Sequence, residues 1–190
     1  MKAKERAVQQ GLGGQIEFLV SDARDLSGVS GMAYDAVLLM GPLYHLVLKE
    51  DRLLALRQAY SRTNAGGVLF SAFISRFGII GDLIKKQSEY VHEQKRFDSL
   101  LVQGHEDTNG GLGNFRGYFA TVDEIAPLHE EVGFKTLAVA GVEPAISSDD
   151  DSYNRLEGET RRLWLDLLYR MTTERSIVAA SRHLLYVGQK

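Results

Sequence analysis

The sequence predicts an α/β domain built around a mainly parallel sheet. Short apolar runs alternate with longer segments that carry apolar residues at helical spacing, and glycine-rich or polar stretches separate them. This alternation is typical of strands joined by helices in a layered fold. The chain has 190 residues, of which 44% are hydrophobic. Residues 1–190 are therefore expected to form a single domain with a substantial core.

The first third of the chain is expected to contain one helix and two strands. Residues 1–10 predict a short helix with Gly11 as its C-terminal cap. Residues 16–20 predict a strand that is buried largely on both faces, because alternating and neighbouring positions are apolar. Residues 36–40 form a second apolar run of strand length.

The middle of the chain changes to a helical period. From Glu50 the apolar residues recur at helical spacing, and residues 64–67 (NAGG) are expected to end that helix. Residues 68–74 (VLFSAFI) predict a third strand, and residues 80–101 predict one long amphipathic helix. Residues 104–117 are rich in glycine, which favours a mobile lid or binding loop.

The last third is expected to alternate helix and strand again. The motif TVDE at residues 121–124 matches a capping box, and the helix that it starts should stop at Gly133. Residues 134–142 predict a fourth strand. Residues 156–171 carry apolar side chains at helical spacing, and residues 184–187 predict a closing strand that could lie antiparallel at the edge.

Composition excludes several classes of function. The net charge is −3, which gives no electrostatic support for a nucleic-acid partner or for binding to a membrane surface. The chain has no cysteine, so disulfides, thiolate metal sites and cysteine nucleophiles are excluded. No apolar run approaches the length of a transmembrane helix. We therefore expect a cytoplasmic protein that binds neither a nucleic acid nor a membrane.

The best candidates for ligand contacts follow the predicted strands. Ligands of open α/β sheets bind outside the carboxyl ends of the strands, which here places residues 21–24, 41–45 and 75–77 at the site. A carboxylate at Asp22 could accept a hydrogen bond from an exocyclic amine, while the next backbone N–H, that of Ala23, could bond a ring nitrogen. The alternative is that Asp22 only caps the turn after its strand.

The turn at residues 41–45 (GPLYH) is more specific. Glycine allows a ligand to approach the backbone closely, and proline stiffens the turn. Tyr44 and His45 could contact a ligand or a reacting group, with His45 as a general base. The alternative is the start of a helix in which Leu43 packs inward and His45 is a polar surface residue.

Two weaker signals lie in and after the glycine-rich loop. His105, Glu106 and Asp107 could be read as metal ligands, but three consecutive side chains do not converge on one ion, so no metal site is predicted. Arg116, Tyr118 and Phe119 could shape a substrate pocket, and Phe119 could equally be an ordinary buried aromatic residue.

The order of these segments resembles a known family. IEFLVSDARDL followed by YDAVLLMGPLYHL resembles the middle of a class I S-adenosylmethionine-dependent methyltransferase. The next helix and strand are matched by ALRQAYSRTNAGGVLFSAFIS, the penultimate pair by GYFATVDEIAPLHEEVGFKTLAVAGVEP, and the closing strand by SRHLLYVGQK. The resemblance therefore spans nearly the whole chain.

The resemblance implies a cofactor and a site. Asp22 and Ala23 would hold the adenine ring of S-adenosylmethionine through the side chain and the backbone N–H. The four residues Met40, Gly41, Pro42 and Leu43 would line the methionine side of the cofactor. Tyr44 and His45 would face the methyl-acceptor pocket and are the candidate catalytic residues. The implied fold is a Rossmann-like seven-stranded sheet with an antiparallel last strand.

The chain departs from the family at its N-terminus. The family begins with a strand, a GxGxG turn, a helix and a second strand, and none of these is found in the sequence. We therefore expect an N-terminally truncated sheet of about five strands, with either a hole or a new direct pairing between the strands at residues 16–20 and 36–40. The exposed edge predicts either a truncated gene product or a chain that forms a homodimer through this region, and cofactor binding should be weak or absent if the missing half is not supplied. The alternative function is a non-catalytic methyltransferase-like protein that acts through dimerisation or a partner.

Overall fold

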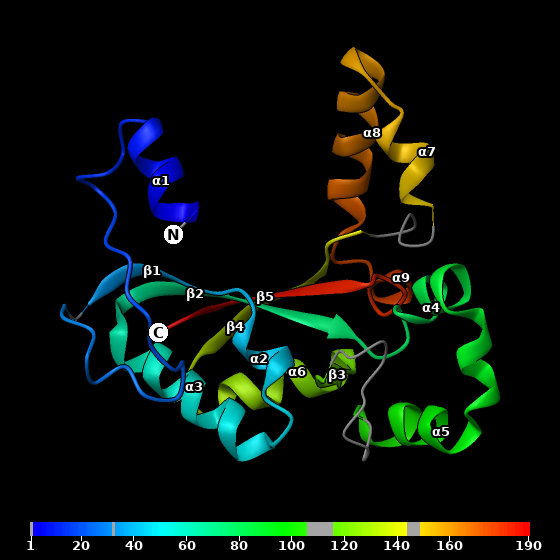
Figure 1. Cartoon of the computed structure of the whole chain (residues 1–190), viewed down its shortest axis with the longest axis horizontal. Coiled ribbons are helices and arrows are strands. Elements are labelled where there is room, and N and C mark those ends of the chain that lie inside the picture. Colours follow the sequence, from blue (N-terminus) through cyan, green and yellow to red (C-terminus); the bar gives the residue numbers. More distant parts are fainter. Residues whose placement is uncertain (1, 32, 106–115, 144–148) are drawn as a thin grey trace.

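The protein contains a five-stranded mixed sheet. The computed structural model describes residues 2–31, 33–105, 116–143 and 149–190. Four strands follow one another across the sheet in the order β1-β2-β5-β4, and β3 pairs with the end of β2 (Figure 1). The strands are β1 (Tyr34–Leu39), β2 (Thr63–Ser75), β3 (Phe119–Ala120), β4 (Lys135–Gly141) and β5 (His183–Gln189).

The strand directions confirm a mainly parallel sheet with an antiparallel last strand, but this strand lies inside the sheet and not at its edge. β1 and β3 run parallel to β2, whereas β5 lies between β2 and β4 and is antiparallel to both. Four strands therefore point one way and only β5 points back. The helices of the described residues are α1 (Lys2–Gln9), α2 (Pro42–His45), α3 (Lys49–Arg62), α4 (Ile80–Lys86), the 3₁₀ helix η1 (Ser88–His92), α5 (Gln94–Gln103), α6 (Val122–Glu130), α7 (Asp150–Asn154), α8 (Gly158–Met171) and α9 (Arg175–Val178).

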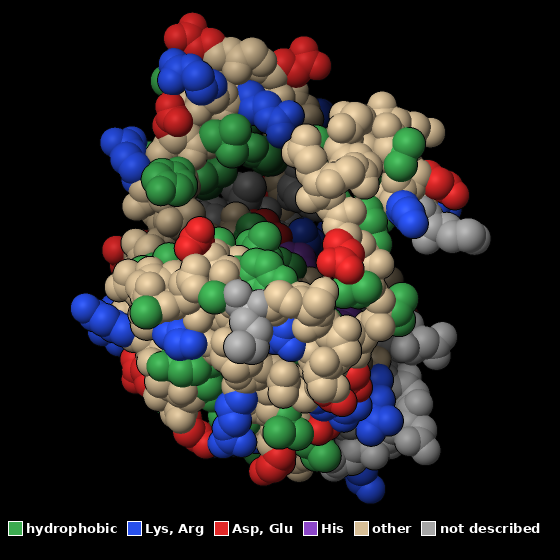
Figure 2. All heavy atoms as spheres, turned by 90° about the vertical axis from the view of Figure 1, so that its left-hand side faces the viewer, with side chains coloured by type: hydrophobic (Ala, Val, Ile, Leu, Met, Phe, Trp, Pro, Cys, Tyr) green, Lys and Arg blue, Asp and Glu red, His purple; other side chains and the backbone are tan. Residues whose placement is uncertain are grey.

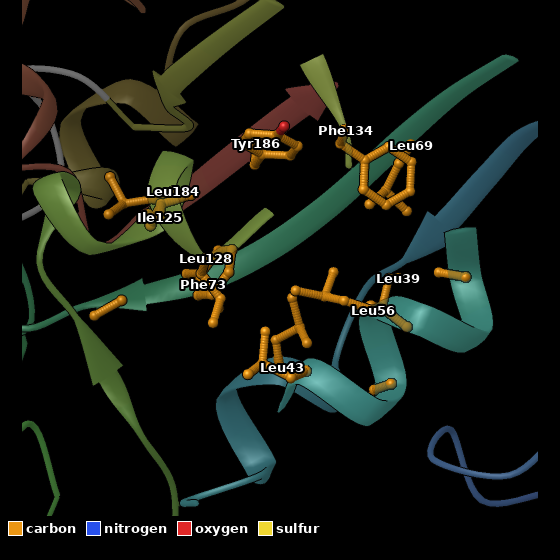
Figure 3. Packing of buried hydrophobic residues seen from close by; sticks show 14 of the residues in the cluster. Leu39, Leu43, Leu56, Leu69, Phe73, Ile125, Leu128, Phe134, Leu184 and Tyr186 are labelled. Carbon is orange, nitrogen blue, oxygen red and sulfur yellow. The ribbon is translucent and has the colours of Figure 1, made fainter. Parts of the chain in front are cut away.

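The main core lies between one face of the sheet and the helices α3 and α6 (Figure 3). Along β2 the burial alternates, so Leu69 and Phe73 point into this core and are fully buried. Leu56 of α3 and Ile125 of α6 meet them from the helix layer. Each such side chain contributes about 1.5–3 kcal/mol through the removal of apolar surface from water.

The opposite face of the sheet is apolar but only partly covered. Phe70 of β2 and Val187 of β5 point to it and are half-buried, and Leu38 of β1 is 68% exposed. α1 and α8 stand on this side at the two ends of the sheet (Figure 1), and Figure 2 shows hydrophobic side chains around a hollow in this region. Strands that are apolar on both faces are typical of sheets that are covered on both sides.

The strand predicted over residues 16–20 is wrong. The segment has no regular secondary structure in the described chain, and its apolar side chains, Phe18 and Val20 among them, are exposed. A strand forms only where a neighbour accepts its backbone hydrogen bonds, and β1 pairs with β2 alone. The direct pairing between this segment and β1 is not formed, so β1 is an edge strand.

The chain between this segment and β1 is held by α3 instead. The Arg62 guanidinium donates to the carbonyl oxygens of Leu26 and Val29, at 2.7 Å for Val29. The backbone N–H of Leu26 donates to the side chain of Gln58 at 3.3 Å. These side chains replace the ladder of hydrogen bonds that a sheet would supply.

The single long helix predicted over residues 80–101 is also wrong. The backbone leaves the helical region at Gln87 (φ −147°, ψ 48°) and at Glu93 (φ −87°, ψ 58°), which divides the segment into α4, η1 and α5. The two breaks fold the segment around a second apolar cluster. Its buried members are Leu83, Tyr90, Leu100 and Phe119.

The start of α6 agrees with the predicted capping box. The backbone N–H of Thr121 donates to the Glu124 carboxylate at 2.7 Å, which satisfies a donor that the helix leaves free. The helix ends before Gly133, whose φ of 112° is rarely adopted by other residues. No helix of the described residues is long and apolar enough to cross a membrane.

Arg76, which follows β2 directly, is hydrogen-bonded to three other elements of the fold. Its guanidinium is buried and donates to the carbonyl oxygens of Phe119 at 3.0 Å and Val102 at 3.2 Å. It also forms an ion pair with Glu124 at 3.0 Å. One side chain thereby joins α5, β3 and α6 at the carboxyl end of the sheet.

His129 is a buried, neutral histidine in the core. Its Nδ1 lies 2.7 Å from the Ile125 carbonyl oxygen and therefore carries the proton, so Nε2 accepts from the Ser71 hydroxyl at 2.8 Å. The ring stacks on Tyr186 with 3.6 Å between centroids. Burial lowers the pKa of His129 from 6.5 to about 4.

This lowered pKa predicts a loss of stability in mild acid. Between about pH 6.5 and about pH 4, the unfolded chain binds a proton on His129 and the folded chain does not, so the free energy of unfolding should fall by up to about 3 kcal/mol as the pH is lowered. Urea unfolding across this range measures the effect. The change of the unfolding free energy with pH should be smaller in His129→Gln than in the wild-type chain. It should be unchanged in His92→Gln, which alters an exposed histidine. If the unfolding free energy depends on pH equally in both variants, His129 is not the group responsible.

A second prediction concerns Arg76. The Arg76→Ala variant should lose roughly 2–3 kcal/mol of unfolding free energy, because charged hydrogen bonds to buried carbonyl groups are removed. The matched control is Arg162→Ala on α8, whose ion pairs with Glu159 and Asp166 are exposed and should be worth less than about 1 kcal/mol. Chemical denaturation compares the two variants, and an equal loss would show that Arg76 does not anchor this region.

Candidate functional site

The predicted turn lies at the carboxyl end of β1. The strand ends at Leu39, and the chain passes through Met40 and Gly41 directly into α2. Pro42 occupies the first turn of this short helix, where its fixed φ is favourable and its missing N–H costs no hydrogen bond. The turn therefore has the position that ligand-binding residues occupy in open α/β sheets.

The side chains of this turn divide into exposed and buried ones. Leu43 is fully buried in the core, as in the inward-packing alternative that the sequence offered. Met40 and His45 are exposed and Tyr44 is half-buried. The Tyr44 and His45 rings lie 4.8 Å apart at a tilt of 52°. Thus Met40, Tyr44 and His45 can be reached by a ligand, whereas Leu43 can offer only its backbone.

Asp22 lies in an exposed turn where its carboxylate is already engaged. It accepts the backbone N–H of Arg24 at 2.9 Å and pairs with the Arg24 guanidinium at 2.7 Å. The side-chain hydrogen bond from Arg24 holds the pKa of Asp22 at about 2. Here Asp22 closes its own turn, as in the capping alternative, and it remains on the surface where a ligand could compete for it.

The two predicted segments come together at the start of α3. Ala23 packs against the same core cluster that contains Leu43. The Arg24 guanidinium also pairs with Asp51 in the first turn of α3, at 3.1 Å. Ala23 therefore packs on the core that also holds Leu43, and Arg24 links the Asp22 turn to the first turn of α3, although no strand carries Asp22.

Two residues outside the turn support it. The backbone N–H of Tyr118 donates to the Tyr44 carbonyl oxygen at 2.8 Å. The Arg52 guanidinium donates from Nη1 to the carbonyl oxygens of Leu46 at 2.9 Å and Val47 at 2.7 Å. Sequence analysis did not select Arg52, although a basic residue on the apolar face of α3, in register with Leu56, is a signal of a specific role.

Tyr118 and Phe119 have different roles. Tyr118 lines a cavity between α3 and α6, together with Arg52 and Phe73. Phe119 is buried in the second apolar cluster, which confirms that it is an ordinary core residue. Of the residues once considered as metal ligands, Glu106 and Asp107 lie outside the described residues. Within the described ranges, no group of three or more acidic or histidine side chains is arranged to hold a metal ion.

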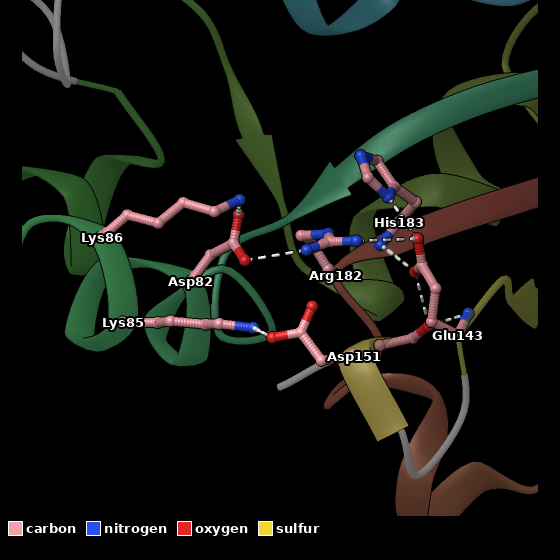
Figure 4. A network of polar contacts seen from close by, with 8 residues as sticks. Asp82, Lys85, Lys86, Glu143, Asp151, Arg182 and His183 are labelled. Atoms are coloured by element: carbon pink, nitrogen blue, oxygen red, sulfur yellow. Dashed lines mark hydrogen bonds and ion pairs between the residues drawn. The ribbon is translucent and has the colours of Figure 1, made fainter. Parts of the chain in front are cut away.

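A polar network stabilises the same edge of the sheet beyond β2 (Figure 4). Arg182, just before β5, pairs with Asp82 of α4 at 2.7 Å and with Glu143, just after β4, at 3.7 Å. Glu143 also accepts from the backbone N–H of His183 at 3.0 Å. Burial would raise the pKa of Glu143, but the hydrogen bonds from His183 outweigh it and the net pKa lies below its ordinary value. The network thereby fixes α4 beside the start of β5.

The comparisons with known proteins concern the fold. No protein-family model matches the sequence, and no curated protein matches it significantly. Among solved structures, a SAM-dependent methyltransferase from Methanosarcina mazei is similar over 92% of this chain and 66% of its own, with a TM-score of 0.55 and 17% identity. A SAM-dependent methyltransferase from Thermotoga maritima, described as a possible histamine N-methyltransferase, is similar over 95% of this chain and 68% of its own, with a TM-score of 0.51 and 16% identity.

A third similar structure is that of a cyclase and not of a methyltransferase. The [4+2]-cyclase SpnF matches 99% of this chain and 61% of its own, with a TM-score of 0.53 and 12% identity. This chain therefore spans about two thirds of the length of these proteins or less. At such identities the likeness concerns the fold and not the reaction. The chain has the fold of the class I S-adenosylmethionine-dependent methyltransferases.

Proposed function

We propose that the protein is a S-adenosylmethionine-dependent methyltransferase that acts on a small-molecule acceptor. The observation that carries the proposal is the turn from β1 into α2, which presents Met40, Tyr44 and His45 at the carboxyl end of a strand in a methyltransferase fold. A binding site at this edge is what the topology of open α/β sheets favours. S-adenosylmethionine, when bound, would supply an activated methyl group.

The residues of the chain fit one side of such a cofactor. Asp22 and Ala23 are proposed to bind the adenine ring, and the stretch from Met40 to Leu43 to line the methionine side. The Asp22 carboxylate would have to exchange its contact with Arg24 for the ligand. Methyl transfer depends mainly on positioning. Tyr44 is therefore assigned to orient the acceptor, and His45 to accept a proton from it.

The proposal predicts weak cofactor binding that depends on Asp22. The sequence contains no strand followed by a GxGxG turn, so we expect calorimetry to give an affinity for S-adenosylmethionine weaker than about 10 μM. The Asp22→Ala variant should bind about tenfold more weakly or worse, since a charge-assisted hydrogen bond is lost. The matched control is Asp25→Ala in the same exposed loop, which should leave the affinity unchanged.

Three outcomes decide the proposal. Binding that is lost only in Asp22→Ala supports it. Binding that both variants retain would place the adenine elsewhere and contradict the assigned residues. Absence of binding to this chain, and to a longer chain that adds a GxGxG-type unit before it, would refute the methyltransferase function itself.

A second candidate function is a non-catalytic, methyltransferase-like protein that acts through dimerisation or a partner. It is favoured by the open edge of β1 among the described strands and by the partly covered apolar face beside it, where Leu38 is exposed. Apolar sheet edges and patches of this kind promote association. A homodimer with two-fold symmetry would pair the two β1 edges antiparallel and extend the sheet across both subunits.

Sedimentation velocity tests this second function. The expected result is a dimer at about 100 μM or below. Leu38→Lys should yield monomers, because a charge on the β1 strand opposes edge pairing. Leu54→Lys changes an exposed leucine of α3 and should leave the dimer intact. A wild-type chain that remains monomeric would exclude the homodimer.

A further inference from the structure

A cavity of about 290 Å³ lies between α3 and α6, close to the carboxyl end of the sheet. Most of its wall is apolar and is formed by Phe73, Ala120, Ile125, Pro127 and Leu128. The polar lining comes from Lys49, Arg52, Tyr118, Glu124 and Glu131. The volume is close to the lower end of the range for small-molecule sites.

Arg52 is a lining residue with a buried hydrogen-bond donor that has no partner. Its side chain is only 5% exposed, and its guanidinium stacks on the Tyr118 ring with 3.6 Å from Cζ to the ring centroid. Nη1 donates to two carbonyl oxygens, but Nε is buried and has no hydrogen-bond partner. A buried donor without a partner costs about 1–3 kcal/mol of stability. The edge formed by Nε and Nη2 thus has no partner in the described chain.

The carboxylates near Arg52 are engaged by other cations. Glu124 pairs with Arg76 at 3.0 Å, and Glu131 pairs with Lys49 at 2.9 Å across the opening of the cavity. Glu50 is exposed on the first turn of α3 and does not line the cavity. Arg52 is therefore the cation of this lining whose guanidinium forms no ion pair with a carboxylate of the described residues.

We propose that this cavity binds a small organic monocarboxylate with an apolar body. The carboxylate would accept a charge-assisted hydrogen bond from Nη2 of Arg52, because Nη1 already donates to two carbonyl oxygens and Nε is enclosed by the protein. The apolar body would occupy the space between Phe73, Ile125 and Leu128. A polar sugar does not match the apolar wall. The proposal does not depend on methyl transfer.

Calorimetry with simple acids and their uncharged analogues tests this directly on the wild-type chain. Benzoate and hexanoate are the probes, and benzamide and hexanamide are their controls of equal shape. At least one acid should bind with a dissociation constant of about 1 mM or tighter, and its amide should bind at least tenfold more weakly. Absence of binding by both acids at roughly 10 mM, or equal binding of acid and amide, would overturn the proposal.

Variants then locate the site. Arg52→Gln should remove the preference for the acid over the amide, so that the ratio of their affinities approaches one. Arg57→Gln is the matched control, because Arg57 is exposed on the same helix and should retain the full ratio. If Arg52→Gln fails to fold, Leu128→Phe narrows the apolar part of the cavity and should weaken the acid at least tenfold while the chain remains folded by circular dichroism. Loss of the preference in Lys49→Gln but not in Arg52→Gln would assign the anion to the rim and contradict the proposal.

Discussion

The central strand β2 is the element on which the rest of the structure depends. It pairs with β1 on one side and with β5 on the other, and its last residues also pair with β3. Its alternating side chains supply the middle of the main core, where Leu69 and Phe73 face α3 and α6. Every strand except β4 therefore takes its position from hydrogen bonds to β2. The turn into α2 and the buried Arg76 both lie at the end of the sheet that β2 defines.

The buried cations Arg76 and Arg52 connect this end of the sheet to the candidate site. Arg76 secures the chain after β2 to α6, and Arg52 holds the carbonyl oxygens that follow α2. Both guanidinium groups approach the Tyr118 ring, whose backbone in turn holds Tyr44. The turn that presents Tyr44 and His45 is thus supported from the helix layer and not by the sheet alone. This arrangement explains how a four-residue helix keeps a defined position.

The sequence was a good guide to local structure and a poor one to pairing. The strands around residues 68–74 and 134–142 and the cap of α6 were predicted because their signals are local: apolar runs, glycine and the TVDE motif. The segment at residues 16–20 has the composition of a strand, but strand formation depends on a neighbour that its own residues do not encode. Helical periodicity likewise missed the breaks at Gln87 and Glu93, which follow from packing around Tyr90.

The same limit applies to the site. The position of the turn at residues 41–45 could be predicted from the order of elements, whereas the inward direction of Leu43 and the engagement of Asp22 by Arg24 required three-dimensional contacts. Arg52 was missed because its partner ring, Tyr118, is distant in sequence. The direction and the partners of these side chains are set by contacts between residues far apart in the chain, which composition and spacing do not reveal.

The insertion of β5 between β2 and β4 has a consequence for biosynthesis. β5 ends at Gln189, and the backbone of Lys190 exchanges hydrogen bonds with Gly66 and Gly67. β2 and β4 are made earlier on the ribosome but share no hydrogen bonds with each other. Their facing edges stay unpaired until β5 has left the ribosome and has paired with both strands. The nascent chain consequently carries an incomplete sheet until β5 is made, and the binding of chaperones would protect it during that interval.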